Sequence, residues 1–158
     1  MKQISPEIDY LLSAVQSLDE RTRREAIIEL VRCGDESGGK LLMKYINGDD
    51  IKLKGVVAHA LLELDLTSGL ARTLSKSLWF SIAINQLVFT YRGHPQGFIR
   101  GENSQEEIKI RRVGFALNNE AGMELMLTAY KEFTKLNEVY GAPRNLEILW
   151  DGIGDWLG

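Results

Sequence analysis

The stretch DERTRREAIIEL, residues 19–30, is followed at an offset of 31 residues by DIKLKGVVAHAL, residues 50–61. Both stretches place an aspartate before a basic residue and then a run of apolar residues at helical spacing. The aligned pairs are Asp19 with Asp50, Arg23 with Lys54, Ala26 with Val57, and Leu30 with Leu61. Each stretch is therefore predicted to form a helix that follows a short turn containing an aspartate.

The same offset extends to the segments before these turns. The apolar residues that match are Leu11 with Leu42, Leu12 with Met43, and Val15 with Ile46. The chain is therefore expected to contain helix pairs near residues 7–33 and 38–64 and no β-sheet. Internal similarity at this period is typical of helical solenoids, because one helix pair cannot bury its apolar face alone and stacks on a neighbour. Leu30 and Leu61 are then equivalent core positions.

The two stretches resemble HEAT repeats, in which an aspartate in the turn and a basic residue precede a second helix with small and leucine positions. The residues of the first stretch that fit are Asp19, Arg23, Ala26 and Leu30. In the second stretch Lys54 stands where the family has arginine, and Val57 stands where it has alanine. The resemblance covers about residues 8–90. It implies an all-α fold, a short α-solenoid with a binding surface, and no particular chemistry.

A third, degraded unit is expected after residue 64. Leu70, Leu74 and Leu78 share one helical stripe, and an apolar segment follows at residues 79–91. This segment reads as a helix, because a strand would have no partner elsewhere in the chain, although the pattern alone also allows a strand.

The segment RGHPQGFIRGENSQ, residues 92–105, interrupts the helical pattern with three glycines and a proline. Its Arg92, His94 and Arg100 are candidate anion contacts. The glycines match no phosphate-binding fingerprint. Two interpretations stay open: a solvated connector, or a ligand loop formed by residues 92–103.

Residues 106–158 are predicted to form a helical cap on the solenoid. Ser104 and Glu107 have the spacing of a capping box, and Asn118 with Asn119 is expected to make the turn into a methionine-bearing helix over residues 120–136. A final helix is expected to start at Pro143.

The last ten residues, LWDGIGDWLG, continue the apolar stripe of that final helix through Ile153 and Leu157. Trp150 is expected to be buried against the methionine-bearing helix with a partner for its indole N–H. Trp156 is expected to be partly exposed and is a candidate partner contact. The alternative is that these residues form a free docking motif.

The composition predicts one domain without targeting signals. The chain has 158 residues, a net charge of −3 and 44% hydrophobic residues, which is ordinary for a globular protein. The single cysteine, Cys33, allows no internal disulfide, and the N-terminus has no apolar signal core, so the expected location is cytoplasmic with no membrane contact.

No sequence motif indicates a catalytic site, a cofactor or a metal. The two histidines show no metal-ligand spacing, and His59 is expected to be a structural residue of its helix. Stacked repeats would align a strip of basic residues, made of Arg21, Arg23, Arg24, Lys52 and Lys54. Within it, Arg23 and Lys54 are candidate contacts for a partner or an anion. Acidic neighbours interrupt the strip, so nucleic acid is an unlikely partner. If Arg23 and Lys54 are structural, each is expected to pair with a carboxylate of a turn.

The function predicted from these patterns is a non-catalytic protein–protein interaction module, an adaptor or scaffold. The alternative is an enzyme or a protein that binds a small ligand or anion through the glycine-rich loop 92–103. The partner would be another protein, and the sequence leaves its identity and the oligomeric state open. A shallow groove with exposed apolar side chains would favour the scaffold, whereas a deep pocket beside the loop would favour the enzyme.

Overall fold

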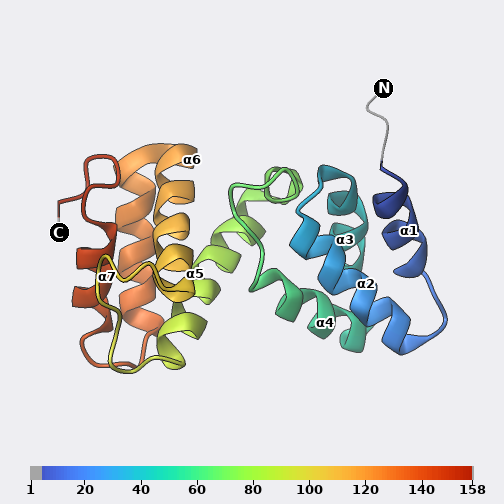
Figure 1. Cartoon of the computed structure of the whole chain (residues 1–158), viewed down its shortest axis with the longest axis horizontal. Helices are drawn as coiled ribbons and strands as arrows, with labels where there is room; N and C mark the ends of the chain where they lie inside the picture. Colours follow the sequence, from blue (N-terminus) through green and yellow to red (C-terminus); the bar gives the residue numbers. More distant parts are fainter. Residues whose placement is uncertain (1–4, 158) are drawn as a thin grey trace. The chain divides into compact units, whose positions relative to one another are not determined.

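The computed structural model describes residues 5–157, and every regular element in that range is helical (Figure 1). The α-helices are α1 (Pro6–Ala14), α2 (Glu20–Cys33), α3 (Gly39–Ile46), α4 (Ile51–Leu61), α5 (Lys76–Arg92), α6 (Gln105–Leu136) and α7 (Ala142–Trp150). Two 3-10 helices, η1 (Glu36–Gly38) and η2 (Ala71–Thr73), complete the described part of the chain. The all-α prediction is confirmed, including a helix rather than a strand over residues 79–91.

The chain groups into two compact units, one ending at Trp79 and the other starting at Phe80. The first unit contains α1 to α4, and the second contains α6 and α7. Helix α5 begins in the first unit and continues into the second.

In the first unit, the two aligned aspartates perform the same task. The Asp19 carboxylate accepts the backbone N–H of Thr22 at 2.8 Å, and the Asp50 carboxylate accepts that of Leu53 at 3.0 Å. Each aspartate is the N-cap of its helix and satisfies a backbone donor that the first turn would otherwise leave unpaired. The helix pairs predicted near residues 7–33 and 38–64 are present.

The core of this unit lies where α2 meets its neighbours. Helix α1 packs against α2, α2 packs against α4, and α3 packs against α4. Leu30 and Leu61 are 0% and 1% exposed, which confirms them as core positions, and the aligned Ala26 and Val57 are buried as well. Burial of a leucine side chain stabilises the fold by about 1.5–3 kcal/mol.

The first helix of the expected third unit is not formed. Residues 68–75 make turns and the short η2 instead, because the backbone N–H of Leu70 donates to the carbonyl of Gly34 at 2.8 Å and ties the segment to the end of α2. Leu70 and Leu74 are nevertheless buried. The segment therefore closes the first unit without adding a helix to it.

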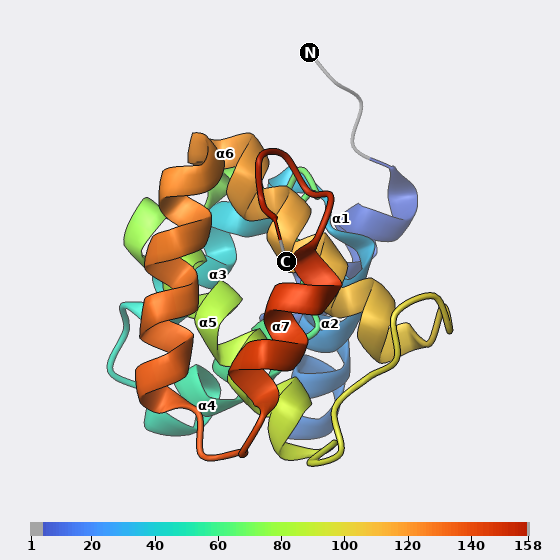
Figure 2. The same cartoon turned by 90° about the vertical axis from the view of Figure 1, so that its left-hand side faces the viewer.

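In the second unit, α7 packs against α6, and α6 consists of two helical segments between which the chain reverses direction (Figure 2). The turn predicted at Asn118 and Asn119 is wrong by a few residues: the bend is at Ala121 and Gly122, and Gly122 has a φ of 65°. Glycine adopts this left-handed conformation without the steric cost that a Cβ imposes, which explains why the chain turns there.

The final segment does not continue the helix to Leu157. Helix α7 ends at Trp150, and Gly152 and Gly154 have φ values of 80° and 55°, which fold the chain back on itself. Ile153 is still buried, but Leu157 is 88% exposed, so the prediction that Leu157 shares the buried stripe is wrong.

Trp150 is fully buried, and its indole Nε1 donates to the carbonyl of Ile110 at 3.1 Å, as expected for a buried indole. It packs on the part of α6 before the bend: a Cβ built at Gly114 would lie 2.8 Å from the indole. The methionine-bearing part is contacted by Trp156, whose ring centroid lies 5.6 Å from that of Tyr130.

The prediction that Trp156 is partly exposed is wrong. Its side chain is 4% exposed, its Nε1 donates to the carbonyl of Glu147 at 3.2 Å, and its ring meets Trp150 edge to face at 5.2 Å. The two left-handed glycines reverse the chain after Trp150, so Trp156 returns to the core. The segment is packed, and Trp156 is not available to a partner.

Leu30→Ala and Leu61→Ala should each lower the free energy of unfolding by about 2–5 kcal/mol, because each leaves a cavity in the core between helices. Denaturant titration of the full chain measures this, with Leu18→Ala as the control because Leu18 is fully exposed. Losses below about 1 kcal/mol for both core variants would mean that the two leucines are not equivalent core residues.

Trp156→Ala should lower the free energy of unfolding by about 3–5 kcal/mol, because it removes a buried aromatic ring from the contact with Trp150 and Tyr130. A thermal melt compares it with the wild type and with Leu157→Ala, an exposed neighbour that should leave the midpoint unchanged. Coincident melting curves for Trp156→Ala and the wild type would show that the segment is not part of the core.

Candidate functional site

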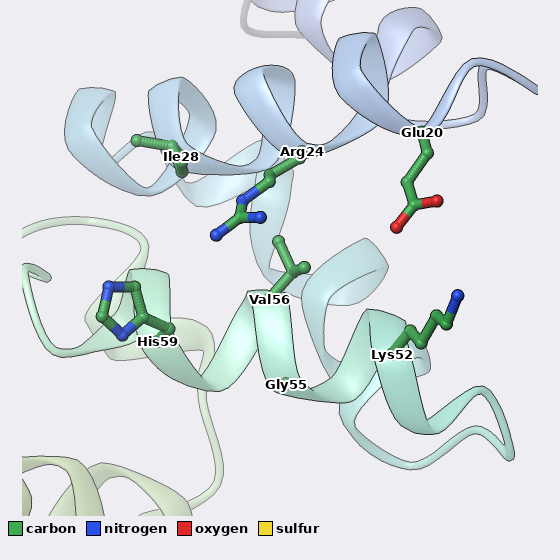
Figure 3. A pocket seen from close by; sticks show the side chains of 7 residues that line it. All are labelled: Glu20, Arg24, Ile28, Lys52, Gly55, Val56 and His59. Carbon is green, nitrogen blue, oxygen red and sulfur yellow. The ribbon is translucent and has the colours of Figure 1, made fainter.

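A groove of about 300 Å³ lies between α2 and α4 in the first unit (Figure 3). Its lining residues are Glu20, Arg24 and Ile28 from α2, and Lys52, Gly55, Val56 and His59 from α4. Ile28 and Val56 are half-buried and the other five residues are exposed. The groove is therefore an open surface feature without a fully buried lining residue.

The helical spacing of the lining residues explains how the groove forms. On α2 the lining residues recur every four positions, and on α4 they fall three and four positions apart, so each set occupies one face of its helix. The neighbouring faces carry the buried residues, such as Leu30 and Leu61. Because α2 and α4 pack against each other, their outer faces border one shared groove.

Two cations of the groove have no carboxylate partner within the protein. Among residues 5–157, neither Arg24 nor Lys52 forms an ion pair, whereas the adjacent Arg21 is paired with Glu25 at 2.9 Å. In Figure 3 the Arg24 guanidinium extends from α2 toward α4, and Lys52 stands at the same end as Glu20. With one carboxylate against two permanent cations, the lining carries a net positive charge in a chain whose net charge is −3.

Gly55 lies inside α4 and is exposed. A glycine inside a helix costs about 0.5–1 kcal/mol relative to alanine, so it usually has a packing reason. Among residues 5–157, a Cβ built at Gly55 meets no atom within 4 Å, so the space beside this glycine is open.

The basic strip predicted from the sequence divides in the structure. Arg24 and Lys52 enter the groove, whereas Arg23 and Lys54 are half-buried and lie outside its lining. The expected pairing of Arg23 and Lys54 with turn carboxylates is not observed: neither has an ion pair within residues 5–157. The Arg23 charge acts on Tyr45 instead, whose pKa is raised by burial and lowered to a smaller extent by Arg23.

The loop after α5 does not gather its three basic residues into an anion site. Arg100 Nη1 contacts Asp151 Oδ2 at 2.5 Å, and His94 Nε2 lies 3.8 Å from Glu106 Oε1. Arg92 is exposed in the last turn of α5. Two of the three predicted anion contacts therefore already face a carboxylate of the same unit.

Two polar side chains hold this loop in place. The Asn145 amide accepts from Tyr91 Oη at 2.9 Å and from the Phe98 N–H at 3.2 Å, and it donates to the Phe98 carbonyl at 2.7 Å. The buried Glu107 carboxylate accepts the N–H groups of Gly101 and Asn103, both at 2.9 Å. The loop is a fixed structural element in which these side chains satisfy the backbone groups.

Ser104 caps α6 as predicted, since its hydroxyl accepts the Glu107 N–H at 3.1 Å. Glu107 itself uses its carboxylate for the loop. Neither this role nor that of Asn145 was predicted, because the partners of Asn145 lie up to 54 residues away in the chain.

A second, broader hollow of about 800 Å³ lies in the second unit, around residues 137–141 and the adjoining parts of α6 and α7. Its Glu147 receives hydrogen bonds from Arg144 at 2.7 Å and from Tyr130 at 2.8 Å, which lower the pKa of the Glu147 carboxyl. These three polar groups satisfy one another, so the hollow offers no unpaired charge of theirs to a ligand.

The described residues give little support for a metal site or a nucleophilic cysteine. No group of three or more His, Cys, Asp and Glu side chains within residues 5–157 is arranged to hold a metal ion. Burial, together with the charges of Glu7, Glu29 and Asp35, raises the pKa of the Cys33 thiol, which disfavours the thiolate that a nucleophile requires. None of the helices in this range is long and apolar enough to cross a membrane.

Comparison of the chain with protein-family models, curated proteins and solved structures gives no match. The structure itself defines an all-helical protein with an open, cationic groove on its first unit. Three groove residues had no predicted role: Ile28, Gly55 and Val56. His59, which we expected to be a structural residue of its helix, is exposed at the end of the groove (Figure 3).

Asn145→Ala should lower the free energy of unfolding by about 1–3 kcal/mol, because it leaves the Phe98 backbone and the Tyr91 hydroxyl without their partner. Hydrogen exchange should also become faster in the loop 93–104. Denaturant titration and exchange mass spectrometry measure the two effects, with Asn119→Ala as the exposed control. Unchanged stability and unchanged exchange would show that the loop does not depend on Asn145.

Proposed function

We propose that the protein is a non-catalytic protein-binding module that contacts its partner through the groove between α2 and α4. The observation that carries this proposal is a pair of cations, Arg24 and Lys52, that form no ion pair within residues 5–157 and lie beside the half-buried Ile28 and Val56. Apolar area rimmed by charge is typical of protein interfaces. An enclosed small-molecule site would bury most of its ligand, and the exposure of five of the seven lining residues argues against that use.

The first unit is proposed to be a short HEAT-like solenoid of two helix pairs. The equivalent capping by Asp19 and Asp50, the equivalent burial of Leu30 and Leu61, and the packing of α2 on α4 support this proposal. Solenoids present extended surfaces to their partners, which agrees with a binding role for the groove. We also propose a cytoplasmic location, on the ground that the only cysteine, Cys33, is a free thiol.

The alternative, an enzyme or an anion-binding protein that uses the loop 92–103, has weaker support. His94 and Arg100 already face carboxylates, and Asn145 and Glu107 satisfy backbone groups of the loop. Loss of the partner on substitution of loop residues, and not of groove residues, would favour this alternative.

Charge-reversal substitutions in the groove test this proposal. Arg24→Glu combined with Lys52→Glu should abolish retention of the partner from native extract and weaken the affinity of the purified pair by at least about tenfold, which corresponds to about 1.4 kcal/mol. Quantitative mass spectrometry identifies the partner, and calorimetry then measures the affinity. Both substitutions lie on exposed side chains, so the melting midpoint should stay near that of the wild type.

The matched control is Lys40→Glu combined with Lys44→Glu, which makes the same charge change on exposed residues of α3 outside the groove. It should retain the partner with wild-type affinity. If the groove variant binds as the wild type does, and Arg92→Glu with Arg100→Glu loses the partner, the loop and not the groove is the binding site.

A further inference from the structure

Gly55 indicates what kind of partner the groove accepts. We propose that the groove holds an acidic, amphipathic α-helix of a partner protein, whose backbone comes closest to the chain at Gly55. This inference rests on the proposed function, because it names the occupant of the same groove.

Among residues 5–157, no group occupies the space that a side chain at Gly55 would fill. Gly114, the comparable glycine inside α6, lies under the Trp150 indole, where a Cβ would clash at 2.8 Å. At Gly55 the corresponding space is empty to at least 4 Å. Glycine permits close approach of a ligand to the backbone, and the open space at Gly55 leaves room for a group from outside the protein.

The shape of the groove suits a helix as its occupant. The groove runs between two helices that pack side by side, with Ile28 and Val56 as its apolar contacts. An amphipathic helix can lay its apolar face into such a groove. The distance between packed helix axes depends on the side chains at the contact, so a position without a side chain allows the added helix to lie close.

The charge of the groove suits an acidic occupant. Arg24 on α2 and Lys52 on α4 lack ion-pair partners within residues 5–157, and a carboxylate on the added helix would pair with either of them. Glu20 stands at the Lys52 end of the groove and offsets the charge there (Figure 3). The acidic residues of the partner should therefore concentrate around Arg24, away from the end formed by Glu20 and Lys52.

A nucleic acid fits these observations less well. A duplex or single strand is held by many phosphate contacts, whereas this groove offers two permanent cations and one carboxylate. The half-buried apolar residues, Ile28 and Val56, have no use in contacts with a phosphate backbone.

The experiment selects binders from a displayed library of a stable helical hairpin that carries one randomised helix face. Selection uses the full chain, with removal of clones that also bind Arg24→Glu with Lys52→Glu. The recovered faces should combine apolar residues with aspartate and glutamate. The affinity of purified clones is then measured for the wild type, Gly55→Ala, Gly55→Leu and Ala58→Leu.

Gly55→Ala should weaken the selected clones by about tenfold, and Gly55→Leu should weaken them by more than about a hundredfold, because each added group occupies the space of the partner. Ala58 is also exposed on α4 but lies outside the groove lining, so Ala58→Leu should change affinity less than about twofold. Gly55→Ala fits the helix without a clash and should raise the melting midpoint by about 1–4 °C, so weaker binding cannot be ascribed to unfolding.

Three results would overturn the inference: selection that yields no groove-dependent clone, recovery of basic faces, or unchanged affinity for Gly55→Leu. Tighter binding of a fluorescein-labelled 20-base oligonucleotide than of any clone would also overturn it, in favour of a nucleic acid. If the native partner no longer binds the variant with Arg24 and Lys52 reversed but still binds Gly55→Leu, the proposed function holds and the close approach of a helix at Gly55 is refuted. If the native partner binds both variants as it binds the wild type, the proposed function itself is refuted.

Discussion

The packing of α2 against α4 is the contact on which the first unit depends. Helix α2 lies against α1 on one side and α4 on another, and its Ile27, Leu30 and Val31 are almost completely buried. A single helix pair has no second layer to cover such residues, so the second pair supplies it. The same contact brings the outer faces of α2 and α4 together, and the groove exists only because the two helices are neighbours.

The groove contains residues that contribute little to the stability of the first unit. Gly55 lowers the helix propensity of α4, and within residues 5–157 neither Arg24 nor Lys52 forms an ion pair like that between Arg21 and Glu25. The second unit is stabilised by other interactions than the first. Its stability rests on a buried aromatic cluster and on side chains such as Asn145 and Glu107 that satisfy the loop backbone.

The helix pairs could be predicted because their determinants are local or periodic: a capping aspartate, a helical stripe and a repeat offset. Leu30 and Leu61 follow directly from that pattern. The burial of Trp156 could not be predicted, because a helical pattern assumes that the helix continues past Trp150. Instead, two glycines with positive φ values reverse the chain there. The contact between Arg100 and Asp151 joins residues 51 positions apart, which no local pattern reveals. The groove itself was not predicted: the sequence placed Arg24 and Lys52 in one basic strip but gave no reason to single out Gly55.

The most direct test of the account is whether α2 and α4 are neighbours in solution. A nuclear Overhauser spectrum of the full chain with labelled isoleucine, leucine and valine methyl groups measures this contact without any partner. The account predicts cross-peaks that connect methyl groups of α2 with methyl groups of α4, in addition to those between α1 and α2 and between α3 and α4. A spectrum that contains the contacts within each pair but none between α2 and α4 would contradict the stacking of the pairs and, with it, the groove.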